Sequence, residues 1–208
     1  MAHTKQELVG HIEAPCLIAM NQTHSNEFML IEKSQGALVA KNSAGTACFS
    51  LQNASHMNAD VIHFSGSVHV VDADACITNV PGVLLSVKTA DCMPILIQAD
   101  DYVAVIHAGR VGSLHEITKR VAEWLYSKSV KNVNVWFGPA SCLFCYQIDR
   151  DTNTHFDLLQ ENVSQIKSIF GAGVSLYYSN ACTQCDSELY FSFRSGDESS
   201  RNVFYISR

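Results

Sequence analysis

The sequence has no run of basic residues and little positive charge. It carries 14 Lys and Arg against 20 Asp and Glu in 208 residues, so its formal net charge is −6 at pH 7. Nucleic-acid-binding domains typically gather Lys and Arg on one face or along one stripe. This composition therefore argues against a nucleic acid as the partner.

Long apolar stretches are also missing. Residues 83–106 form the most apolar segment, but Lys88, Asp91 and the pair Asp100-Asp101 interrupt it, whereas a membrane span needs roughly 20 apolar residues. The N-terminal stretch MAHTKQELVG lacks the apolar core of a signal peptide. We therefore expect a cytoplasmic protein without a membrane partner, whose eight cysteines are reduced thiols or metal ligands.

Nucleotide-binding glycine motifs and internal repeats are absent as well. Neither a GxGxxG fingerprint nor a P-loop lysine motif occurs, and no stretch has the composition of a linker. With 47% hydrophobic and 16% charged residues, a chain of this length can bury one full core. We expect one domain over residues 1–208, and the sequence leaves its oligomeric state open.

Short β-rich runs dominate the middle and the end of the chain. Residues 83–87, 94–98 and 102–107 predict adjacent strands, with Asp100-Asp101 as the turn between the last two. Further strands are predicted at residues 133–137, 174–178, 189–193 and 203–206.

Two segments have helical periodicity. Residues 113–116, Ser-Leu-His-Glu, have the form of a capping box before apolar residues spaced as on one helix face. Residues 156–170 predict a second amphipathic helix. Because helices and strands alternate without a regular βαβ rhythm, we predict an α+β fold, a layered sandwich of mixed β-sheets flanked by helices.

A cysteine and a histidine lie in two distinctive motifs of the middle segment. Cys92 belongs to Thr-Ala-Asp-Cys-Met-Pro, and His107 begins His-Ala-Gly-Arg-Val-Gly. The predicted strands place the two residues side by side. Thiolate sulfur and imidazole nitrogen are ligands that zinc prefers, and a site with three protein ligands keeps a fourth position for chemistry. The pair therefore indicates a catalytic metal site.

These two motifs resemble those of the YfiH-like family, long known as laccase-domain polyphenol oxidases and regarded as zinc-dependent purine nucleoside enzymes. Other segments are similar to family motifs in the same order along the chain: Asp72-Ala73-Asp74-Ala75-Cys76-Ile77-Thr78, Phe137-Gly138-Pro139-Ala140, Cys145-Tyr146-Gln147-Ile148-Asp149, Ala181-Cys182-Thr183 and Phe191-Ser192-Phe193-Arg194. The resemblance covers residues 72–208, and residues 1–71 are atypical of the family.

The resemblance also implies a third metal ligand. In the family it is the His of a Gln-x-His-Gly motif, which residues 22–25 match with Ser in place of Gly, so the implied zinc ligands are His24, Cys92 and His107. His56 is the alternative third ligand, because it ends a faint match to another family element.

The family's chemistry is the phosphorolysis of adenosine, inosine or guanosine to base and ribose 1-phosphate, together with adenosine deamination and methylthioadenosine cleavage. Zinc lowers the pKa of a bound water to around 7, and the resulting hydroxide can attack adenine C6. A purine nucleoside and phosphate are therefore the implied partners.

Catalytic roles are expected for Cys92, His107, Asp91 and Arg110. Arg110 at a helix start is the predicted phosphate partner, although the family carries its Arg one position later. Asp91 is either a partner of a His ligand or a proton acceptor, or it is a turn residue. Arg194 and Arg201 are similar to arginines near the family's C-terminus, and surface roles explain them equally well.

Two Cys-x-x-Cys pairs form a second candidate metal site. Cys142 and Cys145 make the first pair, and Cys182 and Cys185 make the second. This spacing is typical of structural zinc sites with four cysteines. Against that interpretation, Cys145 and Cys182 fall on family positions that hold Cys without such a site.

Three other functions remain open. A peptidoglycan-precursor editing amidase would use Cys92 as metal ligand or nucleophile. A copper polyphenol oxidase (laccase) is less consistent with the sequence, because none of the nine histidines forms the His-x-His pairs of a multicopper centre. A non-enzymatic binding module stabilised by zinc would depend on the Cys-x-x-Cys pairs alone.

Overall fold

The computed structural model describes residues 10–12, 14–50, 62–64 and 66–208, and its central element is an eight-stranded mixed sheet. The strand order is β15-β12-β10-β11-β8-β3-β4-β5. The strands are β3 (Phe28–Ser34), β4 (Ala37–Asn42), β5 (Ala47–Ser50), β8 (Ala75–Thr78), β10 (Met93–Ala99), β11 (Tyr102–Ala108), β12 (Val133–Phe137) and β15 (Val174–Tyr178). An antiparallel hairpin of β10 and β11 forms its centre.

A four-stranded sheet of order β16-β9-β2-β7 covers one face of the larger sheet. Its strands are β2 (Cys16–Asn21), β7 (Ser67–Asp72), β9 (Val83–Thr89) and β16 (Asn202–Ser207). The described residues also form two small ladders. The first pairs β1 (Gly10–Ile12) with β6 (Ile62–Phe64), and the second pairs β13 (Gln147–Asp149) with β14 (Thr154–His155).

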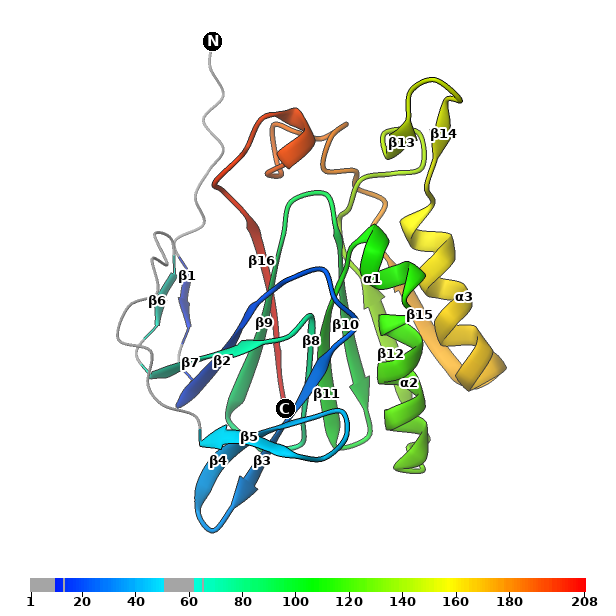
Figure 1. Ribbon diagram of the computed structural model, residues 1–208. Helices are drawn as coiled ribbons and strands as arrows, with labels where there is room; N and C mark the ends of the chain where they lie inside the picture. The colour runs from blue at the N-terminus through cyan, green and yellow to red at the C-terminus, as the bar shows by residue number, and fades with distance from the viewer. Residues whose placement is uncertain (1–9, 13, 51–61, 65) are drawn as a thin grey trace.

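The helices lie together on one side of the eight-stranded sheet (Figure 1). They are α1 (Arg110–Leu114), α2 (Ile117–Ser127) and α3 (Leu158–Phe170), with 3-10 turns η1 (Gly171–Gly173) and η2 (Phe193–Ser195). One apolar core fills the space between helices and sheet, and a second lies between the two sheets. Because apolar layers cover both its faces, β11 is buried along nearly its whole length. No helix among the described residues is long and apolar enough to cross a membrane.

The predicted α+β sandwich of mixed sheets and flanking helices is confirmed. The strands expected at residues 83–87, 94–98, 102–107, 133–137, 174–178 and 203–206 lie within β9, β10, β11, β12, β15 and β16. The helix expected from residue 156 starts at Leu158, because the Asp157 side chain accepts a hydrogen bond from the Gln160 N–H and caps it.

The capping box at residues 113–116 was a wrong prediction. Ser113 belongs to the short helix α1, and its hydroxyl accepts a hydrogen bond from the buried Asn162 amide. Glu116 precedes α2 in the left-handed conformation, with φ of 59°, and makes no side-chain cap. The chain therefore makes a turn between α1 and α2 where one capped helix start was expected. The Ser113 hydroxyl cannot cap α2 because it bonds to Asn162 of α3.

The strand predicted at residues 189–193 was also wrong. This alternating segment adopts turns and ends in the 3-10 turn η2, and it pairs with no strand among the described residues. Its polar position, Ser192, is fully buried and donates a hydrogen bond to Asp91. A buried polar contact with a distant loop therefore overrides the local β pattern.

Candidate metal centre

Three residues distant in the sequence meet at one end of the β10–β11 hairpin. His107 lies near the end of β11, Cys92 immediately precedes β10, and His24 lies in the loop between β2 and β3. Their ligand atoms all lie within 4.8 Å of one another, and 3.7 Å separates Cys92 Sγ from His24 Nε2. His107 is buried and His24 is exposed, so the cluster is open to solvent on the His24 side. We call it the His24–Cys92–His107 cluster.

Asp74 holds both histidines of this cluster in place. It is fully buried just before β8, and its carboxylate lies 2.8 Å from His107 Nδ1, which leaves Nε2 as the free ring nitrogen. The same carboxylate accepts the backbone N–H groups of Thr23, His24 and Ser25 at 3.2, 3.0 and 2.7 Å. Although burial opposes its charge, the hydrogen bonds from His107 and Ser25 hold the pKa of Asp74 well below its usual range. A carboxylate behind a histidine ligand is the usual support of a metal site.

Two glycines let helix α1 approach the His24 loop. A Cβ atom on Gly109 would lie 2.9 Å from both Cys92 Sγ and His24 Cδ2, and one on Gly112 would lie 2.8 Å from the Ser25 carbonyl oxygen. A side chain at Gly109 would therefore push against Cys92 and His24, and one at Gly112 would push α1 away from the His24 loop. The glycines of the His-Ala-Gly-x-x-Gly motif thus serve close packing around the cluster.

Cys92 and His107 shift each other's pKa. Burial opposes the ionised form of Cys92, yet hydrogen bonds to His107 and His24 lower the pKa of the thiol to about 7. Burial likewise opposes charge on His107, but Asp74 and Cys92 raise its pKa to about 9. The thiol is thus poised to ionise near neutral pH, as a metal ligand must.

Asp91 contacts a different part of the chain from the histidines. It is buried, with φ of 84°, and its carboxylate accepts hydrogen bonds from the Thr183 hydroxyl at 2.7 Å, the Ser192 hydroxyl at 2.6 Å and the Arg194 N–H at 2.8 Å. Asp74 therefore occupies the place behind a His ligand that we considered for Asp91. Asp91 instead ties the C-terminal segment to the residue next to Cys92, and its catalytic role remains a prediction.

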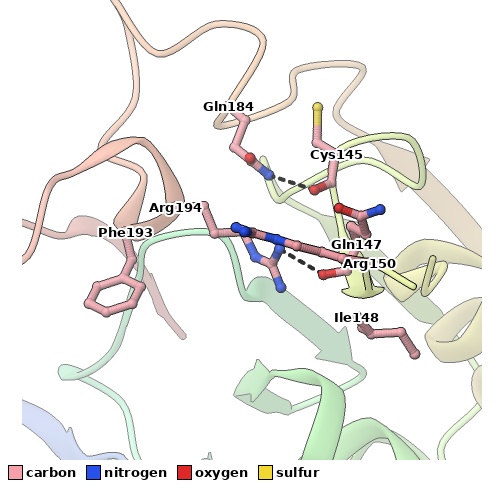
Figure 2. A pocket seen from close by; sticks show the side chains of 7 residues that line it. All are labelled: Cys145, Gln147, Ile148, Arg150, Gln184, Phe193 and Arg194. Carbon is pink, nitrogen blue, oxygen red and sulfur yellow. Dashed lines mark hydrogen bonds between the residues drawn. The ribbon is translucent and has the colours of Figure 1, made fainter. Parts of the chain in front are cut away.

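An open pocket of about 450 Å³ is lined by residues of two segments, 145–150 and 184–194. Its lining consists of Cys145, Gln147, Ile148, Arg150, Gln184, Phe193 and Arg194, with two arginines and no carboxylate (Figure 2). The Arg194 guanidinium stacks 4.3 Å from the centre of the Tyr146 ring and donates to the Gln147 carbonyl. The lining is therefore positively charged and suits an anion.

Tyr146 packs against Arg194 of this pocket. It is 8% exposed. Burial and the nearby Cys92 charge raise the pKa of its hydroxyl, while Arg194 and Arg110 act in the opposite direction. Tyr146 thus contacts Arg194, a lining residue of the pocket, and its pKa responds to the charge of Cys92. Its place in the Cys-Tyr-x-x-Asp motif alone did not indicate either relation.

Two other residues singled out from the sequence, Arg110 and Arg201, belong neither to the described cluster nor to the pocket lining. Arg110 is the first residue of α1, half-buried, and does not line the pocket. Arg201 donates to the carbonyl oxygens of residues 197, 198 and 200, a local structural role. His56 lies outside the described residues. The sequence did not assign roles to Asp74, Tyr146, Arg150 or Phe193. Membership of a family-like motif was the one available signal for Asp74, Tyr146 and Phe193, and Arg150 had none.

Comparisons with known proteins agree with this architecture. Residues 2–170 match the family described as multi-copper polyphenol oxidoreductase laccase. A purine nucleoside phosphorylase of Rickettsia prowazekii is 33% identical over 146 residues, 69% of this chain and 48% of that protein. An adenosine deaminase from an unknown prokaryotic organism is 28% identical over 147 residues, 58% of this chain and 56% of that protein. The chain thus spans about half the length of these relatives.

Solved structures show the same fold. The crystal structure of the hypothetical protein YfiH of Bacillus licheniformis superposes with a TM-score of 0.66 at 19% identity, over 92% of this chain and 73% of that one. The family match includes all three residues of the His24–Cys92–His107 cluster. On its sequence and its fold, the chain belongs to the YfiH-like, laccase-domain family.

Proposed function

We propose that this protein is a zinc-dependent purine nucleoside phosphorylase that splits adenosine, inosine or guanosine with phosphate. The observation that carries the proposal is the His24–Cys92–His107 cluster, whose ligand atoms lie within 4.8 Å of one another. An arginine-lined pocket is tied to it, because the Arg194 backbone N–H donates to Asp91, the residue before Cys92. The names of the relatives support the substrate class. Adenosine deamination and methylthioadenosine cleavage are proposed as further activities of the same site.

The cluster fits a zinc ion on the chemistry of its donors. Two imidazoles and one thiol are the donor types of catalytic zinc sites with three protein ligands. Asp74 fixes His107 with Nε2 free, and Gly109 leaves room for the ligands to converge. Zinc held there supplies Lewis-acid polarisation and lowers the pKa of a water bound to it.

The arginine pocket is proposed as the phosphate site. In phosphorolysis a phosphate oxygen attacks C1′ of the ribose, while the bond from C1′ to the purine nitrogen breaks and its electrons leave with the base. Arg150 and Arg194 can hold the phosphate and offset its charge, because guanidinium groups match phosphate oxygens in pairs. Tyr146 keeps Arg194 oriented by stacking, and the exposed Phe193 ring offers an apolar surface to the nucleoside.

The test is product analysis with zinc-loaded protein, adenosine or inosine, and phosphate. Adenine or hypoxanthine with ribose 1-phosphate is the expected product pair, and inosine from adenosine would report deamination. Arg194→Met should raise the KM for phosphate roughly tenfold or more, as expected for loss of a charged hydrogen bond. Arg208→Met is the matched control, since Arg208 pairs with Asp101 at the opposite end of the β10–β11 hairpin. No turnover of any of these nucleosides would overturn the proposal.

A copper polyphenol oxidase is the second candidate, favoured by the family's description. Two histidines and a cysteine also suit copper. Among the described residues, however, no candidate cluster holds more than these two histidines, whereas a multicopper centre needs many. Metal analysis separates the two functions, because the oxidase requires copper in several sites per chain.

A peptidoglycan-precursor editing amidase is the third candidate. It is favoured by the Cys92 thiol, whose pKa of about 7 and contact with His24 also suit a nucleophile. Cys92→Ala distinguishes the roles. Loss of zinc together with activity supports a ligand, whereas amidase activity lost with zinc retained supports a nucleophile.

A further inference from the structure

The two Cys-x-x-Cys pairs meet in the structure, although 40 residues separate them. Cys142 and Cys145 lie in the turn after β12, and Cys182 and Cys185 lie in the turn after β15. The four sulfur atoms all lie within 4.8 Å of one another, and 3.5 Å separates the Cys145 and Cys185 sulfurs. We call this group the four-cysteine cluster.

The backbone around this cluster is already arranged for sulfur ligands. The N–H groups of Cys142 and Cys185 point to Cys182 Sγ at 3.3 and 3.5 Å. Such N–H donors stabilise negative charge on a sulfur atom. The Tyr146 N–H donates to the Cys142 carbonyl and closes the first turn, and the Asp186 N–H donates to the Cys182 carbonyl and closes the second.

Contacts outside the sulfurs hold the two turns against each other. Ala140 and Cys182 form an isolated parallel bridge. The Gln184 amide donates to the Ser141 hydroxyl at 2.6 Å and to the Cys145 carbonyl at 3.2 Å (Figure 2). The sulfurs therefore converge because the backbone places them there.

We propose that the four-cysteine cluster is a second zinc site, closed by four thiolates and separate from the His24–Cys92–His107 cluster. Zinc with four protein ligands has no open position, so its role is structural. Both turns that it joins contribute to the arginine pocket, since Cys145 of the first turn and Gln184 of the second line it. The site thus anchors the segment that carries Thr183, Ser192 and Arg194 to Asp91, next to Cys92.

Metal stoichiometry tests the proposal without any assay of turnover. Protein saturated with zinc and then desalted should hold about two zinc ions per chain. Cys142→Ser and Cys185→Ser should each lose one of them, and Cys92→Ala should lose the other. Cys16→Ala is the matched control, because Cys16 is buried in β2 away from both clusters, and it should keep both ions.

Cadmium substitution gives a second measurement that needs no variant. The wild-type protein loaded with ¹¹³Cd should give two resonances, one typical of four thiolate ligands and one of mixed nitrogen and sulfur ligands. A single mixed-ligand resonance would overturn the proposal, as would equal zinc content in the wild type and Cys142→Ser. A Cys145–Cys185 disulfide in the zinc-saturated protein, found by counting thiols, would overturn it too. All these outcomes are independent of whether nucleosides are cleaved.

Discussion

The two cysteine-containing clusters of this protein differ in how the chain builds them. The His24–Cys92–His107 cluster draws its ligands from three segments, and the buried Asp74 stands behind one ligand while Gly109 packs against the other two. The four-cysteine cluster draws two ligands from each of two turns and relies on backbone contacts between them. The first offers three ligands and the second offers four. Three ligands leave a metal ion one open position for chemistry, whereas four ligands close the site and suit it to anchoring the chain.

Cys92→Ala should have the largest effect and separate the clusters most sharply. Removing the thiol leaves two histidines, so we expect zinc to leave this cluster and nucleoside turnover to fall to background. The four-cysteine cluster should keep its metal ion. Zinc content and initial rates measured on one preparation check both expectations. Retained turnover in Cys92→Ala would mean that chemistry does not depend on this cluster.

Asp74→Asn should have the next largest effect. A neutral amide holds the proton on His107 Nδ1 less strongly than the carboxylate does. The amide is also a weaker acceptor for the backbone N–H groups of the His24 loop, and its NH₂ group cannot accept from them at all. Losing such a carboxylate typically lowers metal affinity about 10- to 100-fold. Competition with a zinc chelator measures the change. Asp72→Asn is the control, since Asp72 is exposed and bonds to Asn21, and it should leave affinity unchanged.

Gly109→Ala tests whether space around the cluster matters as much as its donors. The new methyl group would lie 2.9 Å from two ligand side chains, and overpacking of this kind costs about 1–3 kcal/mol. We expect zinc affinity to fall roughly tenfold, in line with that cost. Gly173→Ala meets nothing within 4 Å and should bind zinc as the wild type does. Equal affinities in the two variants would contradict the packing argument.

Motifs located the first cluster, but they did not reveal its support. Cys92 and His107 could be paired from the sequence because β10 and β11 form a short hairpin with a clear turn. His24 came from a family resemblance, since its place depends on hydrogen bonds to Asp74 from a loop with no periodic pattern. Asp74 had no assigned role because nothing local to its motif shows that a distant loop folds over it.

The wrong predictions have the same physical origin. Ser113 and Ser192 lie in patterns typical of a helix cap and of a strand, yet their hydroxyls are buried against Asn162 and Asp91. A buried polar group that lost its partner would cost about 1–3 kcal/mol, which exceeds the local preferences behind those patterns. Contacts between residues this far apart in the chain cannot be deduced from a single sequence.

The smallest expected effect is a difference in alkylation rate between the cysteines of the metal-free protein. Because the pKa of Cys92 is lowered to about 7, its thiolate should form around neutral pH and be lost as the pH falls further. A free cysteine of ordinary pKa near 8.5 should react with iodoacetamide roughly tenfold more slowly at pH 7 on thiolate fraction alone. Cys16, whose pKa is raised by burial, should react more slowly still.

Peptide mass spectrometry gives the rate at each cysteine, and zinc added beforehand should protect Cys92. A Cys92 rate that keeps rising steeply above pH 8 would contradict the proposed charge arrangement, because a thiol activated by His24 and His107 has already ionised there.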